Sequence, residues 1–516
     1  MTLINSTIID FFNDNVKKYT KEIGMTFNEV EYTWEEINNI SSSFAYKLYM
    51  SGVKKGTRVA ILGTNSSSWL FYYFAILKLG GIPVLLNSRF KQLELYKSMT
   101  TAKVQCLVYS QGFRGMSYDE LVSHIGGNCL IKKSFAMEQD VEVLHKLAQE
   151  EVEFDFDGQS KSQDIATVLF TSGTTGDAKG VPLSNYNLIN NAIAMSKALR
   201  MTNKDIICLS VPLFHCFGIT ACVLASLVAG CKIVVLEEFK TTEVCNAIVD
   251  NKCTILNGVP SMFLALLNNP VFGEYDLSSL RTGIIAGSAI YRKDFYEISK
   301  AIPSLRLLTS YGQTEASPCI TIADYHDSVE CRSVYSGKVI PNVQVRIKNT
   351  TDGSICDHGY FGEIQVKGYN IMKGYIGAPE IDTETFTEDG WLKTGDIGRL
   401  TKDGYLEISG RSKNIIIRGG ENISPTEIEN YIRDIVDKQA IKVLGIPAEV
   451  IQEEIVAVIE QKEDDQLRQE IRNNLKKRIS GYKVPKLVIF IEEFPRLASG
   501  KINETELKKM VLKLVK

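Results

Sequence analysis

Short apolar runs alternate with helix-length segments over most of the chain. Each run has the length of a buried strand and is bounded by polar or glycine-containing residues. The runs occupy residues 59–62, 104–108, 165–170, 206–210, 232–236, 254–256 and 282–286. Such alternation is typical of parallel sheets covered by helices on both faces. We therefore expect an α/β fold with a large N-terminal domain of parallel sheets.

Helix signals separate these runs. Residues 31–50 lead into a helix that Gly52 ends. Residues 69–79 are apolar on most sides and close on a glycine pair, which predicts a core helix packed on a sheet. A further helix should begin near Ser184.

The pattern changes after about residue 335. Residues 362–368, 391–400 and 405–409 read as short alternating strands, with Asp403-Gly404 as a hairpin turn between the last two. This predicts a small β subdomain over about residues 336–410, within an N-terminal domain of residues 1–410.

A compact α+β domain is expected over residues 411–516. Its first helix should begin at Ser424-Pro425-Thr426-Glu427, a capping-box pair with proline at the first helical position. A second helix is marked by apolar residues at every fourth position: Leu467, Ile471, Leu475 and Ile479. Strands are expected at residues 441–444, 455–459 and 488–491. This pattern suggests a small α+β lid, joined to the preceding domain by a linker at residues 410–414.

Composition narrows the class of protein. With 516 residues, 44% hydrophobic and 23% charged, the chain should fold into two or three globular domains. A formal net charge of −3 argues against a dedicated nucleic-acid binder. The 11 cysteines include no Cys-x-x-Cys pair, which favours reduced thiols in a cytoplasmic protein. The longest uncharged run, residues 211–231, contains Pro212 and Gly218 and favours a buried turn and helix over a membrane span.

A hydroxyl- and glycine-rich loop at residues 170–180 is the main candidate for chemistry. Backbone N–H groups of such a loop between a strand and a helix can hold a polyphosphate, and glycines let the backbone approach it closely. The candidate phosphate ligands are Thr171, Ser172, Gly173, Thr174, Thr175, Gly176 and Lys179. Because Gly180 follows Lys179, the order is not that of the P-loop NTPases. A mobile polar turn is the alternative interpretation.

Further candidate ligands lie downstream of this loop. Residues 311–315 follow the apolar run 305–308 and should therefore lie at the carboxyl end of a strand, where open α/β sheets bind ligands. An aromatic ring there can stack on a base, and a carboxylate can hold Mg²⁺ against phosphates. The segment reads Tyr311, Gly312, Gln313, Thr314 and Glu315. Farther along come the carboxylate of Asp396, the guanidinium of Arg411 and, in residues 495–501, a lone lysine at Lys501.

In order and spacing these segments resemble the motif set of the adenylate-forming superfamily, which contains acyl-CoA synthetases, nonribosomal peptide adenylation domains and firefly luciferase. The resemblance covers nearly the whole chain and points to fatty-acyl-CoA or aryl-CoA ligases. It implies that a carboxylate attacks the α-phosphate of ATP to give an acyl-adenylate and pyrophosphate. A thiol then attacks the mixed anhydride. The implied small molecules are ATP, Mg²⁺, coenzyme A and a carboxylic acid.

The resemblance also implies residue roles. Lys501 should bridge the substrate carboxylate and the α-phosphate, although by itself it would read as a surface lysine. Glu315 and Thr171 should hold Mg²⁺, and Asp396 should bind the ribose. Tyr311 should flank the adenine, with the turn Ala286-Gly287-Ser288 opposite.

Two residues keep alternative interpretations. Arg411 should touch the ribose or a phosphate, or else form an interdomain salt bridge. His215 resembles the aromatic-position residue that gates the acyl site in this family, and the alternative is a buried histidine.

The acceptor is predicted from residues 414–422. In acyl-CoA synthetases the lid rotates and presents this strand beside the pantetheine channel. The resemblance implies a mobile lid with its hinge at Lys413, and Gly419 and Gly420 would leave room for the thin arm. A plain turn is the alternative for these glycines. The luciferase branch places a lysine where this chain has Ile417, which disfavours light production. The alternatives to a CoA ligase are a stand-alone enzyme that loads an acyl carrier protein and a non-catalytic nucleotide-binding relative.

The acyl group is predicted from three candidate lining segments, residues 215–218, 257–262 and 285–289. None of them contains Lys, Arg, Asp or Glu. A charge buried there without a partner would be costly, so an uncharged aliphatic or aryl tail is expected.

Overall fold

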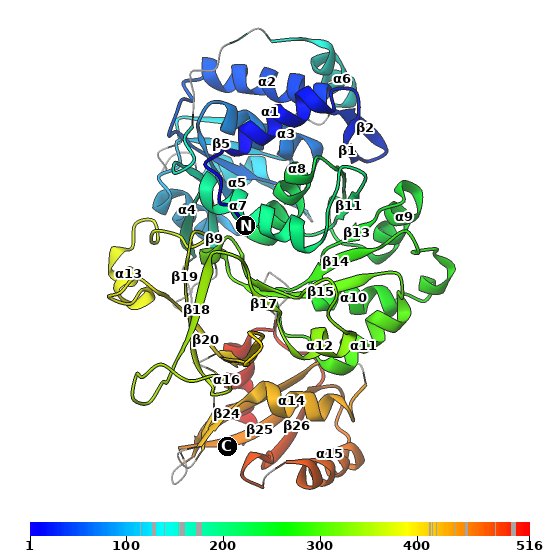
Figure 1. The fold of residues 1–516 in the computed structure, drawn as a ribbon, viewed down its shortest axis with the longest axis vertical. Helices are drawn as coiled ribbons and strands as arrows, with labels where there is room; N and C mark the ends of the chain where they lie inside the picture. Colours follow the sequence, from blue (N-terminus) through cyan, green and yellow to red (C-terminus); the bar gives the residue numbers. More distant parts are fainter. Residues whose placement is uncertain are drawn as a thin grey trace.

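The computed structural model describes the whole chain except residues 114, 126–130, 139, 153, 155–159, 172–177, 412–413, 415, 419–420, 438, 449–451, 480, 497–501 and 516. Two sheets with their helices form the large N-terminal domain in the upper part of Figure 1, and a smaller C-terminal domain, orange to red, lies at the bottom. The predicted α/β class is confirmed.

The larger sheet has nine strands in the order β17-β16-β15-β14-β13-β11-β12-β1-β2. Strands from β15 to β1 run parallel, and antiparallel strands lie at both edges. Their bounds are β1 Ile23–Phe27, β2 Val30–Thr33, β11 Ile206–Leu209, β12 Lys232–Val235, β13 Ile255–Leu256, β14 Thr282–Ile285, β15 Arg306–Gly312, β16 Cys319–Ile322 and β17 Lys338–Val339. The predicted strands in this region are therefore present.

The second sheet has six strands in the order β10-β9-β4-β3-β5-β8. All neighbours are parallel except β9 and β10, which form an antiparallel pair. Their bounds are β3 Arg58–Leu62, β4 Ile82–Leu86, β5 Cys106–Tyr109, β8 Lys133–Ala136, β9 Ile165–Thr171 and β10 Lys179–Ser184. A separate two-stranded hairpin joins β6 (Gly112–Phe113) to β7 (Met116–Ser117).

Two helices contact both sheets. Helix α3 (Ser67–Lys78) contacts β3 and β4 of the second sheet and β1 of the first, and α7 (Asn185–Ala198) contacts β9, β10 and β16. Every residue of α3 except Lys78 is buried, as expected of a helix that is apolar on all sides. The core helix predicted over residues 69–79 is thus confirmed, and so is the helix start at the N-cap Ser184.

The remaining helices of the N-terminal domain are α1 Ile8–Lys18, α2 Trp34–Met50, α4 Gln92–Thr101, α5 Tyr118–Ile125, α6 Val141–Gln149, α8 Ala225–Ala229, α9 Thr241–Asn251, α10 Pro260–Leu267, α11 Arg292–Ala301, α12 Val329–Val334 and α13 Pro379–Thr385. A π-helical segment, η1, covers Phe217–Leu224. The predicted helix at residues 31–50 begins only at Trp34, because β2 precedes it. None of the helices in the described ranges has both the length and the apolar character needed to cross a bilayer.

The β subdomain is a four-stranded antiparallel sheet in the order β18-β19-β20-β21, at the left centre of Figure 1. Its bounds are β18 Val343–Lys348, β19 Gly362–Gly368, β20 Leu392–Leu400 and β21 Leu406–Arg411. Gly404 forms the turn between the last two strands with φ of 81°. The sequence predicted β19, β20 and β21 from the alternating pattern and the turn from Asp403-Gly404, whereas β18 was not predicted.

The C-terminal domain has its own sheet and helices. The sheet contains β22 Ile416–Arg418, β23 Glu421–Ile423, β24 Ile441–Ala448, β25 Gln452–Glu460 and β26 Leu487–Ile491, and the helices are α14 Pro425–Arg433, α15 Asp465–Arg478 and α16 Glu504–Val515. Ser424 caps α14 by accepting the Glu427 N–H. The capping box is incomplete, because both carboxylate oxygens of Glu427 bind Lys483 Nζ at 2.9 Å.

The two domains meet where α14 lies against α11, at the lower centre of Figure 1. Arg433 donates two hydrogen bonds of 2.9 Å to the carboxylate of Asp294, and both side chains are buried. Near this pair, Lys293 forms an exposed ion pair with Asp437 at 3.2 Å. These contacts are polar, as is common at interfaces between domains of one chain.

Candidate functional site

The candidate site lies at the carboxyl edge of the larger sheet. Strands β11, β13, β14 and β15 are parallel, so the loops that follow them emerge at the same edge. These loops carry His215, the segment 257–262, the turn 286–288 and the segment around Glu315. The structure therefore brings together residues that sequence reasoning assigned to the acyl and nucleotide sites.

Asn257 joins the predicted acyl-lining segments. Its side chain is fully buried, its Nδ2 donates to the carbonyl of Ala221 at 2.9 Å, and its Oδ1 accepts the N–H of Ile284 at 2.8 Å. Next to it, the N–H of Gly258 donates to the carbonyl of Ile284 at 3.0 Å. The π-helix η1 is thereby fixed against β14, with the segment 257–262 between them. π-Helical turns occur frequently at functional sites.

His215 is exposed, so the alternative of a buried histidine is wrong. Its backbone is anchored, because its N–H donates to the carbonyl of Pro212 at 3.2 Å and its carbonyl accepts the N–H of Ile219 at 3.1 Å. The imidazole centroid lies 4.5 Å from that of Phe214. A side chain at Gly218 would place its Cβ 2.3 Å from the carbonyl oxygen of Pro212, which explains the glycine in this tight turn.

Tyr311, Asp396 and Arg411 form one polar group. The hydroxyl of Tyr311 donates to Asp396 Oδ2 at 2.7 Å, and Nε of Arg411 lies 3.0 Å from Oδ1. Burial raises the pKa of the Asp396 carboxyl, while Arg411 and the Tyr311 hydrogen bond act in the opposite direction. Arg411 and Asp396 are paired across neighbouring strands, β21 and β20. Arg411 therefore forms a salt bridge within the β subdomain, and its partner Asp396 is the residue predicted to bind the ribose.

Glu315, Tyr375 and Lys179 form a second polar group. Glu315 is 9% exposed, and its Oε1 accepts the hydroxyl of Tyr375 at 2.7 Å. The Nζ atom of Lys179 lies 5.0 Å from the centroid of the Tyr375 ring. Burial raises the pKa of Tyr375, and the charge of Glu315 adds to this effect, so the phenol stays protonated and donates.

Tyr375 was missed in the sequence. Its contacts with Lys179 and Glu315 join residues far apart in the chain, and no local periodicity marks such contacts. The sequence offered one sign, the glycine at position 374 before it, which has φ of 144° in the structure. A Cβ at that glycine would stand 2.4 Å from Asp382 Oδ2.

Two predicted glycines have steric reasons to be glycine. A Cβ at Gly312 would lie 1.7 Å from the carbonyl oxygen of Pro318, so any side chain there would move the turn that carries Glu315. Gly287 lies between Ala286 and Ser288 and has φ of 87°, which L side chains rarely adopt. A Cβ there would also lie close to Val259. Gln313 and Thr314 lie between Gly312 and Glu315, and the Gln313 N–H donates to the carbonyl of Pro318 at 3.0 Å.

The predicted strand-loop-helix context of the glycine-rich loop is wrong. Thr171 ends β9, and Lys179 begins β10, whose residues pair antiparallel with β9. The loop therefore joins two strands, and helix α7 begins only after β10. The predicted phosphate ligands Ser172, Gly173, Thr174, Thr175 and Gly176 lie outside the described residues, as do Lys413, Gly419, Gly420 and Lys501.

The described residues fit Mg²⁺ bound together with ATP. No group of three or more His, Cys, Asp or Glu side chains that could hold a metal ion occurs in the described ranges. Mg²⁺ commonly binds through one or two carboxylates plus substrate phosphates, and a single buried carboxylate such as Glu315 suits that mode. Asp396 keeps lone pairs for ribose hydroxyls, because a carboxylate offers about four acceptor positions.

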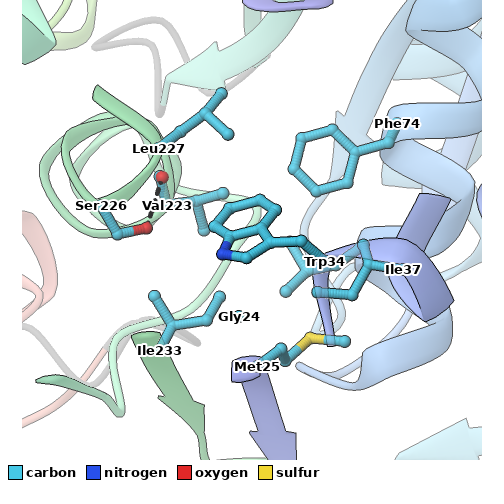
Figure 2. A pocket seen from close by; sticks show the side chains of 10 residues that line it. Gly24, Met25, Trp34, Ile37, Phe74, Val223, Ser226, Leu227 and Ile233 are labelled. Atoms are coloured by element: carbon cyan, nitrogen blue, oxygen red, sulfur yellow. Dashed lines mark hydrogen bonds between the residues drawn. The ribbon is translucent and has the colours of Figure 1, made fainter. Parts of the chain in front are cut away.

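An apolar cavity behind η1 is separate from this site. Figure 2 shows Trp34 and Phe74 facing Val223 and Leu227 across it. Its lining includes two side chains with a polar atom: Ser226, whose hydroxyl donates to the carbonyl of Val223 at 2.7 Å, and Trp34 with its indole N–H. None of the lining residues is charged, so the cavity does not suit a carboxylate or phosphate at the reacting end of a substrate.

Comparison with known proteins assigns the class. Residues 12–376 match the AMP-binding enzyme family, and residues 427–501 match the C-terminal domain of AMP-binding enzymes. The chain belongs to the AMP-binding enzyme family. The predicted membership of the adenylate-forming superfamily is thereby confirmed.

Individual relatives narrow the class further. The mitochondrial medium-chain acyl-CoA ligase ACSF2 of Bos taurus is 30% identical over 95% of this chain and 84% of its own length. ATP-bound MatB from Rhodopseudomonas palustris is 25% identical, with a TM-score of 0.87 over 99% of this chain and 100% of that one. The o-succinylbenzoate CoA synthetase MenE from Bacillus subtilis, in complex with its acyl-adenylate intermediate, is 26% identical, with a TM-score of 0.84 over 98% and 99%. The protein is an AMP-forming acid–CoA ligase.

Proposed function

We propose that the protein activates an apolar monocarboxylic acid as its adenylate, with Mg²⁺, and transfers the acyl group to coenzyme A. One observation carries the proposal: uncharged loops after β11, β13 and β14 meet at the sheet edge that also carries Glu315. The acid would lie among the uncharged loops with its carboxylate toward the Glu315 side of the site.

The first half-reaction brings a carboxylate toward a polyanion, so it depends on charge neutralisation and positioning more than on an acid–base pair. Mg²⁺, when bound, would neutralise phosphate charge and orient the phosphates. We assign its protein ligands as Glu315 and Thr171. Lys179 and the loop before it would hold the β- and γ-phosphates, and Lys501 would face the α-phosphate.

The nucleoside would lie between Tyr311 and the turn at residues 286–288. Asp396 would accept the ribose hydroxyls, and its ion pair with Arg411 would keep the carboxylate charged despite its burial. His215, exposed on an anchored backbone, would gate the acyl site.

The thiols of the acyl-lining segments should stay uncharged at neutral pH. Cys216 lies in one of these segments and Cys222 contacts Asn257 of another, and burial raises the pKa of each thiol to about 12. Both thiols therefore remain neutral. The medium-chain acyl-CoA ligase among the relatives acts on a substrate class of this kind.

We propose that residues 411–516 form a lid that rotates about Lys413 between the half-reactions. Its separate cores support this, one built around Ile428, Ile432 and Ile455 and one around Leu507. In the second pose Gly419 and Gly420 would line the path of the CoA thiol. The cytoplasmic location expected from the cysteines stays a prediction; all ten cysteines in the described ranges are free thiols.

We expect AMP release with CoA to be highest for apolar monocarboxylic acids, because a second charge in the pocket would lack a partner. The measurement is AMP formation across short, medium, long and aromatic acids, with dicarboxylates and amino acids as matched comparisons. A higher kcat/KM for a dicarboxylate or an amino acid than for every apolar acid would contradict the assignment of the pocket. Replacing CoA by a phosphopantetheinylated carrier protein tests the alternative acceptor.

A further inference from the structure

Residues 370–376, here called the strap, connect two parts of the site that are distant in sequence. The N–H of Met372 donates to the carbonyl of Glu315 at 2.9 Å. At the other end of the strap, the N–H of Ile376 donates to the carbonyl of Gly180 at 2.9 Å. The strap thus ties the turn that carries Glu315 to β10, the strand that follows the phosphate loop.

The start of the strap is fixed to the same turn. Asn370 is fully buried, and its Nδ2 donates to the carbonyls of Ala316 at 3.1 Å and Cys319 at 3.0 Å. Its own carbonyl accepts the hydroxyl of Ser317 at 2.7 Å. With its backbone held at both ends, the strap presents its side chains in fixed directions.

Tyr375 is the strap side chain that contacts both parts of the site. Its hydroxyl donates to Glu315 Oε1 at 2.7 Å, and its ring lies beneath the Lys179 ammonium, with 5.0 Å between Nζ and the ring centroid. Its N–H donates to Asp382 Oδ1 at 2.9 Å, which fixes the residue from a third direction. One phenol therefore sets the direction of a carboxylate through its hydroxyl and the position of a lysine through its ring.

We propose that Tyr375 is a positioning residue that orients the Glu315 carboxylate toward the metal ion of Mg·ATP and holds Lys179 beside the phosphates. Mg²⁺ requires nearly ideal octahedral geometry, so a carboxylate of fixed orientation binds it better than one that rotates. Hydrogen-bond partners of metal-binding carboxylates act in this way in other proteins. The proposal rests on the proposed function, because it assumes that ATP and its metal bind at this edge.

Two substitutions separate the roles of the hydroxyl and the ring. Tyr375→Phe removes the hydrogen bond to Glu315 and keeps the ring under Lys179, whereas Tyr375→Leu removes both. The test is ATP binding measured by titration calorimetry without any carboxylic acid, once in EDTA and once with saturating Mg²⁺. The dissociation constant in EDTA divided by the dissociation constant with Mg²⁺ reports how strongly Mg²⁺ and ATP bind together at the site. This quotient is called the ratio below.

For Tyr375→Phe we expect unchanged ATP binding in EDTA and a ratio about tenfold smaller than in the unmodified protein, the scale of a lost hydrogen bond to a charged group. For Tyr375→Leu we also expect ATP binding in EDTA to weaken by about two- to fivefold, the scale of a lost exposed cation–π contact. The control is Tyr405→Phe, which deletes a tyrosine–carboxylate bond of 2.6 Å to Asp327 away from the site. Both constants should stay unchanged in the control.

An unchanged ratio in Tyr375→Phe, with a melting temperature equal to that of the unmodified protein, would overturn the proposal. An equal fall of the ratio in Tyr405→Phe would also overturn it. If the unmodified protein bound no ATP under either condition, the proposed function itself would be contradicted, and this outcome is distinct from a changed ratio. The Phe variant removes a single oxygen atom, so it decides the question even if the Leu variant does not fold.

Discussion

Lys501→Ala is expected to lose acyl-adenylate formation by about 10²-fold or more, because it removes a positioned positive charge between two anions at the reacting centre. The same variant should still convert a supplied acyl-adenylate and CoA to the thioester, since that step no longer joins a carboxylate to a polyphosphate. Pyrophosphate–ATP isotope exchange measures the first step, and thioester formation from synthetic acyl-adenylate measures the second.

The matched control for this variant is Lys508→Ala. Lys508 belongs to the same domain, is 41% exposed at its side chain and lies 3.6 Å from Glu453. Such surface ion pairs contribute little, so both half-reactions should stay unchanged. An equal loss of both steps in Lys501→Ala would show that the lysine acts in folding or docking and not at the α-phosphate.

Lys413→Pro is expected to give the opposite result. Proline fixes φ near −65°, so a hinge that must change its backbone angles would stop in one pose. Step one should be retained and step two should fall by about 10²-fold, the scale of a misplaced reacting group. Lys413→Ala is the control, because it removes the same side chain and leaves the backbone free to rotate.

Gly420→Leu should behave like the hinge variant by filling the proposed thiol path. Gly481→Leu is the control, since a Cβ at Gly481 meets no atom within 4 Å and the residue belongs to the same domain. Assaying each half-reaction separately on these variants tests the division of labour. If every variant lost both steps equally, the domain would serve one fixed active site and would not rotate.

The sequence predicted those parts of the fold that local patterns determine. The caps at Ser184 and Ser424 begin α7 and α14, because each side chain accepts an N–H of the first helical turn. Alternation marked β19, β20 and β21, whose apolar residues Ile364, Val366, Leu392 and Leu406 are buried. Residues 311–315 followed from their position after a predicted strand, whereas the roles of the other site residues came from the resemblance to adenylate-forming enzymes.

Local patterns failed where a distant partner decides the structure. Residues 179–184 contain Gly180 and Pro182 and look like a loop, yet pairing with β9 makes them a strand. Residues 82–86 were missed as β4 because Pro83 lacks an N–H, and β9 joins β4 only at Val84. Tyr375 was missed for the same reason, since the strap and the Glu315 turn meet only in the folded chain.

The most direct test of the acid-activation chemistry follows oxygen-18 from an acid labelled at both carboxylate oxygens. Attack on the α-phosphate forms a bond between phosphorus and one labelled oxygen and releases pyrophosphate. Thiol attack then breaks the bond between that oxygen and the acyl carbon. We expect AMP that carries one labelled oxygen, a thioester that keeps the other, and no ADP. Unlabelled AMP, or ADP together with labelled inorganic phosphate, would contradict it.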